Sequence, residues 1–149
     1  MKRPRGFTLV ELLVVFAIAA LIVGIAPLAF DRLRESAEYR STLRTLVSDM
    51  RMARWRAMSS GTETRFSVDL RERWYGLDGA PRHALASALT LRATVASQEL
   101  ESSGVASIRF LPGGGASGGS IDLLRASGAG VRLRVDWLTG RVEQEPIAP

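Results

Sequence analysis

The stretch Arg5-Gly6-Phe7-Thr8-Leu9-Val10-Glu11-Leu12-Leu13 opens an apolar segment that continues to Phe30. Between Phe7 and Phe30 the only charged residue is Glu11. A helix rises about 1.5 Å per residue, so a helix of this length crosses a hydrocarbon core of about 30 Å. The apolar residues follow no single stripe, which is typical of a helix surrounded by lipid or by similar helices. Residues 7–30 are therefore predicted to form a membrane and assembly helix.

The acidic Glu11 is the anomaly in this segment. An acid at the middle of a membrane costs about +2.5 to +3.5 kcal/mol, whereas about fifteen Leu, Ile, Val and Phe residues contribute about −7 kcal/mol in total. The segment is thus expected to insert despite the acid. A charge retained inside a membrane segment is by default a hypothesis for a functional site.

Two general interpretations compete for this N-terminus. Lys2, Arg3 and Arg5 before an apolar core fit a secretory signal peptide, but an internal acid is unfavourable there and no small-x-small cleavage site follows Phe30. A plain signal anchor is the other interpretation, with the basic residues cytoplasmic and Glu11 near the interface without a role.

A third interpretation comes from resemblance. Gly6-Phe7-Thr8-Leu9-Val10-Glu11-Leu12 resembles the prepilin leader and class III signal of type IV pilins and type II secretion pseudopilins. The resemblance implies a leader over residues 1–6, cleavage between Gly6 and Phe7 by a prepilin peptidase, and methylation of the new Phe7 amine. It also implies that Glu11 takes part in assembly, where it would pair with the Phe7 amine of a neighbouring subunit. Pro27 corresponds to a proline that often kinks the helix in that family.

An amphipathic helix is predicted over residues 31–61. One apolar stripe recurs at spacings of three and four residues and comprises Leu43, Leu46, Val47, Met50, Ala53 and Ala57. Gly61 is a plausible helix stop. Trp55 lies among arginines and could belong to an aromatic and basic patch for nucleic acid, although a packing role is the commoner one.

From Thr62 the apolar period becomes two, which predicts an antiparallel β domain over residues 62–149. The alternating apolar positions are Phe66, Val68 and Leu70; Leu89, Leu91, Ala93 and Val95; Ile108 and Phe110; Ile121 and Leu123; and Val131, Leu133, Val135 and Trp137. A last short strand is expected at Arg141 to Glu143, followed by a frayed tail over 144–149. The predicted fold class is α+β and pilin-like, with a long N-terminal helix packed on this domain.

The segment from Arg71 to Ser87 is rich in turn residues and is predicted to be a loop. It carries Trp74 and Tyr75, which either cover the edge of the core or form a contact surface. His83 is the only histidine and the chain has no cysteine, so we expect no metal site, no cofactor and no catalytic residue.

A second resemblance lies at the C-terminal end of the chain. Phe110-x-Pro112 with Gly118-Gly119, followed by Val135-Asp136-Trp137-Leu138-Thr139-Gly140-Arg141-Val142, is similar to GspH/FimT-type minor pseudopilins. The glycine-rich stretch before Ser120 lacks the Lys-Ser/Thr ending of a phosphate-binding loop and is interpreted as a connection between strands.

Together the two resemblances imply a minor pseudopilin of a type II secretion system, at or near the tip of a periplasmic pseudopilus that supports export of folded proteins. The implied partners are other minor and major pseudopilins, the prepilin peptidase and the bacterial inner membrane. The chain would cross that membrane once, with its N-terminus in the cytoplasm and its β domain in the periplasm. No small-molecule substrate is expected.

Three alternatives stay open. One is a minor pilin of a type IV pilus, and another is a DNA-uptake pilin in which Arg132, Arg134 and Arg141 contact phosphates. A membrane-anchored periplasmic hydrolase is the least favoured. The net charge of +5 includes Lys2, Arg3 and Arg5, so the chain without its leader carries +2 and nucleic acid is an improbable partner.

Overall fold

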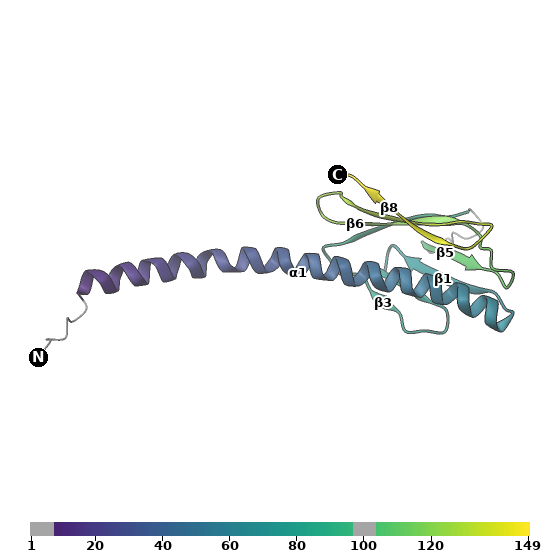
Figure 1. The fold of residues 1–149 in the computed structure, drawn as a ribbon, viewed down its shortest axis with the longest axis horizontal. Coiled ribbons are helices and arrows are strands. Elements are labelled where there is room, and N and C mark those ends of the chain that lie inside the picture. Colours follow the sequence, from purple (N-terminus) through teal and green to yellow (C-terminus); the bar gives the residue numbers. More distant parts are fainter. Residues whose placement is uncertain (1–7, 97–103) are drawn as a thin grey trace, which may run out of the picture. The chain divides into compact units, whose positions relative to one another are not determined.

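The computed structural model describes residues 8–96 and 104–149, and the side chains of those residues except 23–32. In this part of the chain one helix, α1 (Leu9–Ser60), precedes the strands (Figure 1). The chain divides into two compact units, residues 1–37 and residues 38–149. The first contains the N-terminal part of α1, and the second contains the rest of α1 and all the strands.

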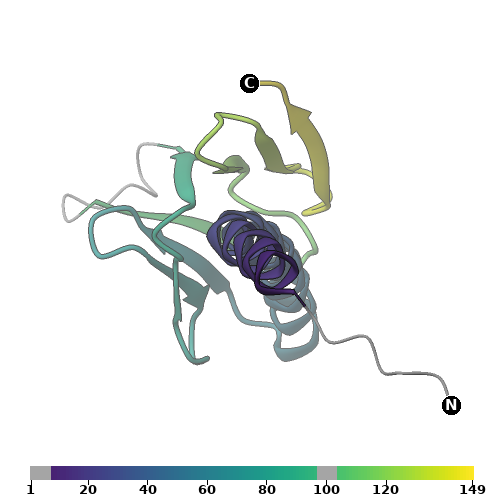
Figure 2. The same cartoon turned by 90° about the vertical axis from the view of Figure 1, so that its left-hand side faces the viewer.

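The strands of the second unit form two antiparallel sheets. Their bounds are β1 (Thr64–Asp69), β2 (Trp74–Leu77), β3 (His83–Ala84), β4 (Thr90–Thr94), β5 (Val105–Phe110), β6 (Gly119–Leu124), β7 (Gly130–Val135) and β8 (Val142–Ile147). Sheet A has the order β3-β2-β1-β5, and sheet B has the order β4-β6-β7-β8. Figure 2 shows the two sheets as separate layers of this unit.

The C-terminal part of α1 shares one hydrophobic core with both sheets. Its stripe of Leu46, Met50, Ala53 and Ala57 is fully buried, as its spacing predicts, and Leu43 packs at the edge. Sheet A contributes residues such as Phe66 and Ile108, and sheet B contributes residues such as Ile121 and Leu133. The predicted α+β class is thereby confirmed. α1 ends at Ser60 because Gly61 adopts a φ of 68°, which a side chain disfavours.

Two predictions of irregular structure are wrong. The segment predicted as a loop from Arg71 to Ser87 contains β2 and β3, and β2 pairs with β1 over Phe66–Asp69. The tail predicted to fray carries most of β8, which pairs with β7 as far as Ile147. β2 and β3 are short and β8 is mostly polar, so these three strands lack an apolar period and are held by cross-strand pairing with their neighbours.

The predicted alternation of exposed and buried residues also fails at particular positions. Ser67 and Asp69 alternate with the apolar positions Phe66, Val68 and Leu70, so the period of two predicts that they face water. Both are buried, because Ser67 Oγ hydrogen-bonds to Ser107 Oγ at 3.0 Å and Asp69 accepts bonds from the backbone N–H groups of Arg71 and Glu72. Trp137, predicted on the core face, is 67% exposed because β7 ends at Val135 and the chain turns there.

Candidate functional site

The first candidate site is the start of α1. Thr8 and Glu11 form a reciprocal capping box, in which the Thr8 N–H donates to Glu11 Oε2 at 2.9 Å and the Glu11 N–H donates to Thr8 Oγ1 at 3.2 Å. The Thr8 hydroxyl also donates to Glu11 Oε2 at 3.0 Å. Gly6 and Phe7, the predicted sites of cleavage and methylation, lie outside the described residues.

The surface that follows Glu11 is apolar and open. Ten large apolar side chains between positions 9 and 22 are 48–83% exposed: Leu9, Val10, Leu12, Leu13, Val14, Val15, Phe16, Ile18, Leu21 and Ile22. An apolar surface of this kind is typical of a segment that contacts a membrane or another protein.

Among the residues whose side chains are described, no helical stretch is long enough and apolar enough to cross a membrane. The membrane segment is predicted over residues 7–30. Phe7 and the side chains of residues 23–30 lie outside the described part of the chain, so this segment stays a prediction. α1 continues through Pro27, and the kink predicted there remains a prediction.

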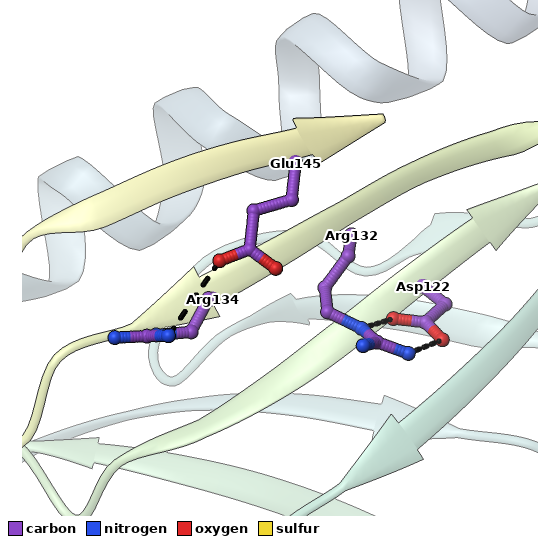
Figure 3. A network of polar contacts seen from close by, with 4 residues as sticks. All are labelled: Asp122, Arg132, Arg134 and Glu145. Carbon is purple, nitrogen blue, oxygen red and sulfur yellow. Dashed lines mark hydrogen bonds and ion pairs between the residues drawn. The ribbon is translucent and has the colours of Figure 1, made fainter. Parts of the chain in front are cut away.

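The second candidate site is the outer face of sheet B, where two of the three arginines proposed to contact DNA lie (Figure 3). Arg132 donates from Nε and Nη2 to the two carboxylate oxygens of Asp122 at 2.8 and 2.9 Å, and this pairing raises the pKa of the Arg132 guanidinium. Arg134 Nη1 lies 3.6 Å from Glu145 Oε1. Arg92, Asp122, Arg132 and Glu145 are register neighbours across the four strands, so positive and negative charges alternate.

Arg141, the third predicted DNA contact, does not join the other two. It precedes β8 and lines a separate depression with Arg51 and Arg54 of α1. Because Arg132 and Arg134 are paired with carboxylates, the positive charge of these two arginines is compensated and is less available to a phosphate backbone. The geometry therefore counts against a DNA interface on this face.

The aromatic residues of β2 mainly have packing roles. Tyr75 is buried and its ring stacks on His83 with centroids 5.3 Å apart, while the Arg82 guanidinium lies 4.0 Å above the Trp74 ring. His83 Nε2 lies 3.4 Å from Asp49 Oδ2. Burial raises the pKa of the Asp49 carboxyl, and the nearby His83 and Arg56 partly offset this. Among the described residues no group of three metal-ligating side chains occurs.

Comparisons with known proteins agree with this arrangement. Residues 1–27 match the prokaryotic N-terminal methylation motif, and residues 42–140 match the family of type II transport protein GspH. Type II secretion system protein H of Xanthomonas campestris pv. campestris is 32% identical over 146 residues, which covers 98% of this chain and 86% of the relative.

Two solved structures share the fold. The minor pseudopilin EpsH of the Vibrio cholerae type 2 secretion system has a TM-score of 0.57 at 11% identity, covering 73% of this chain and 97% of that one. The type IV minor pilin FimU of Pseudomonas aeruginosa has a TM-score of 0.55 at 19% identity, covering 78% and 96%. At these identities the likeness establishes the fold alone, and it extends to both a secretion protein and a pilus protein.

A methylation-type N-terminus, a long helix and a two-sheet antiparallel domain together define a pilin-like protein. Within that class the chain belongs to the GspH family of type II transport proteins. The family implied by the two sequence resemblances is thereby confirmed.

Proposed function

We propose that this protein is a minor pseudopilin of a type II secretion system, a structural subunit at or near the tip of the periplasmic pseudopilus that supports export of folded proteins. The observation that carries the proposal is the family match over residues 42–140 joined to the methylation motif over 1–27. The role is one of assembly with other minor and major pseudopilins and involves no catalytic step of its own.

The N-terminal segment would act in two stages. Before assembly, residues 7–30 cross the inner membrane once, with Lys2, Arg3 and Arg5 on the cytoplasmic side, as the excess of basic residues in cytoplasmic loops suggests. The prepilin peptidase then removes residues 1–6 and methylates the Phe7 amine. After assembly, the exposed apolar side chains between positions 9 and 22 contact the helices of neighbouring subunits.

Glu11 is the proposed docking residue. In the single chain its carboxylate is held by Thr8, so the acid has a local partner before assembly. In the fibre, the Phe7 amine of a neighbouring subunit would replace or share this partner. Removing one member of a buried charge pair costs about 3–5 kcal/mol, which would favour the correct axial register between subunits.

A minor pilin of a type IV pilus is the second candidate, because the likeness to FimU is close to the likeness to EpsH. The family match and the curated relative favour the secretion system.

Deletion of the gene in its own host tests the proposal. We expect export of folded proteins across the outer membrane to fall by at least tenfold, with restoration by the full chain and with pilus assembly unchanged. Normal export combined with loss of surface pili would overturn the proposal in favour of the pilus subunit.

A further inference from the structure

A groove runs along α1 beside β8, which is the last strand in the order of sheet B among the described residues. We call it the Arg44–Trp55 groove. It has a volume of about 530 Å³, and it is lined by Leu43, Arg44, Val47, Ser48, Arg51, Met52 and Trp55 of α1 and by Gln144 of β8. All of these residues belong to the compact unit 38–149.

The groove exposes apolar side chains that the core does not use. Trp55 is 63% exposed and Met52 is 42% exposed, while Val47 and Leu43 form the floor at the margin of the core. A large exposed aromatic beside a flexible methionine is typical of residues that become buried when a protein partner binds.

The charges of the groove are of one sign. Arg44 and Arg51 line it, and a neighbouring depression that shares Arg51 adds Arg54 and Arg141. Arg54 is engaged with backbone carbonyl oxygens. For Arg44, Arg51 and Arg141, no carboxylate of the described residues lies within ion-pairing distance, in contrast to Arg132 and Arg134 on the outer face of sheet B.

The spacing of the arginines further defines the ligand. Arg44 and Arg51 are seven residues apart, so they lie about 10 Å apart along one side of the helix, with the apolar floor between them. A matching ligand would present two carboxylates at a similar separation with an apolar side chain between them. Nucleic acid fits less well, because Trp55 is the single aromatic available for stacking among the lining residues and the floor is aliphatic.

We propose that the Arg44–Trp55 groove binds an acidic amphipathic segment of a neighbouring protein subunit. Its apolar side chain fills the space beside Met52 and Trp55, and its Asp or Glu residues pair with Arg44 and Arg51. The identification of the partner as a fellow subunit rests on the proposed function, whereas the chemistry of the segment rests on the groove.

Site-specific photo-crosslinking in the native host tests this proposal. The photoreactive residue p-benzoylphenylalanine replaces the exposed Ser48 in the full chain, and in a control it replaces Thr90 of β4. After irradiation, the crosslinked peptide is identified by mass spectrometry. We expect position 48 to yield one protein adduct, through a segment with at least two acidic residues flanking an apolar one, and we expect position 90 not to yield it.

Charge reversal then separates binding from proximity. The double variant Arg44→Glu and Arg51→Glu should reduce the adduct at least tenfold, and lysines in place of the partner's acidic residues should restore it. Arg65→Glu, on an exposed position of β1, serves as the matched control and should leave the adduct unchanged. If the double variant loses protease resistance, a second variant, Ser48→Trp, fills the groove from an exposed position, and Thr90→Trp is its control. In these two variants the photoreactive residue replaces Gln144, which also lines the groove.

Several results would overturn the proposal: no adduct at position 48, an adduct with phospholipid, nucleic acid or a second copy of this chain, a crosslinked segment without acidic residues, or an adduct insensitive to charge reversal. Failure of the groove would leave the secretion defect of the gene deletion in place. If the proposed function is wrong, the gene deletion will instead show no secretion defect, so the two failures are distinguishable.

Discussion

The Nε atom of Arg54 donates a hydrogen bond of 2.9 Å to the carbonyl oxygen of Thr139, 85 residues further along the chain. The same atom lies 3.2 Å from the carbonyl oxygen of Gly114. One helical arginine therefore holds both the glycine-rich connection between β5 and β6 and the turn before β8. Gly140 is required at this point, because its φ is 61° and a Cβ there would come within 2.5 Å of the Gly114 oxygen.

We predict that Arg54→Ala lowers the free energy of unfolding by about 2 kcal/mol, because hydrogen bonds from a charged group are worth about 1.5–3 kcal/mol each and this site is partly exposed. Arg54→Lys should have an intermediate effect, since an ammonium cannot reproduce the geometry of the guanidinium. Urea unfolding of the full chain in detergent, followed by tryptophan fluorescence, measures both. Arg65→Ala is the control, and equal losses in Arg54→Ala and Arg65→Ala would contradict the bridging role.

The start of α1 illustrates what sequence could and could not establish. The spacing Thr8-x-x-Glu11 is a capping-box signal that is visible in the sequence, whereas an acid inside an apolar segment predicts a role in assembly. The structure adds the local partner, Thr8. The docking partner is a property of two molecules, so no pattern within one chain could reveal its geometry.

The capping box makes the docking role of Glu11 testable. We predict that Glu11→Ala leaves membrane insertion intact but reduces incorporation into the pseudopilus at least tenfold, whereas Thr8→Ala, which removes only the cap, leaves incorporation near normal. Loss of a helix cap costs about 0.5–2 kcal/mol, so a small effect of Thr8→Ala is expected. Co-purification with other pseudopilins from detergent-solubilised membranes measures incorporation. Equal defects in the two variants would reduce Glu11 to a capping residue.

Processing of the leader gives a separate prediction. Gly6→Leu should block removal of residues 1–6, because the proposed cleavage requires a small residue before Phe7. The intact mass of the protein purified from its own host would then retain the leader, whereas the unaltered chain should begin with a methylated Phe7. Pro4→Ala, also within the leader, is the control and should be processed normally. A mature mass in Gly6→Leu equal to that of the unaltered chain would refute the cleavage site.

The paired charges on sheet B predict a modest stabilising role for Arg132 in place of DNA contact. A double-mutant cycle of Arg132→Gln and Asp122→Asn should give a coupling free energy of about 0.5–1 kcal/mol, because the pair is bidentate but exposed to solvent. Raised salt should weaken this coupling. In a gel shift of the full chain in detergent with duplex DNA at low salt, neither the unaltered chain nor Arg132→Gln should retard the DNA. Retardation that Arg132→Gln abolishes would restore the DNA interface.

The β domain could be predicted where burial imposes an apolar period, as at Phe66, Ile121 and Leu133. It could not be predicted where pairing depends on the backbone. β2 and β8 contain residues such as Gly76 and Pro146, which resemble loop residues, and their strands form because β1 and β7 offer unpaired edges. The separation of Arg141 from Arg132 likewise depends on the turn at 136–140. The alternation of apolar residues does not predict the direction in which that turn leads the chain.

That turn supplies the pH prediction. Asp136 Oδ1 accepts hydrogen bonds of 2.8 Å from the Thr139 hydroxyl and from the Thr139 N–H, and these bonds lower the pKa of the Asp136 carboxyl below 3.8, with the hydroxyl contributing most. A lowered pKa in the folded state means that the ionised carboxylate stabilises the fold above pH 3.8, and that this contribution is lost as the pH falls through the folded-state value. Thr139→Val removes the hydroxyl donor and should move the pKa of Asp136 upward toward 3.8.

Carboxyl carbon NMR of the full chain in detergent, titrated between pH 2 and pH 6, measures this shift. Thr90→Val, which removes an exposed threonine on β4, is the matched control and should leave the Asp136 titration unchanged. The stability advantage of the unaltered chain over Thr139→Val should also shrink below pH 3.8, and it should vanish as the pH falls through the lowered folded-state pKa of Asp136, because that carboxyl then takes up its proton. An unchanged Asp136 pKa in Thr139→Val would show that the backbone N–H alone fixes this turn.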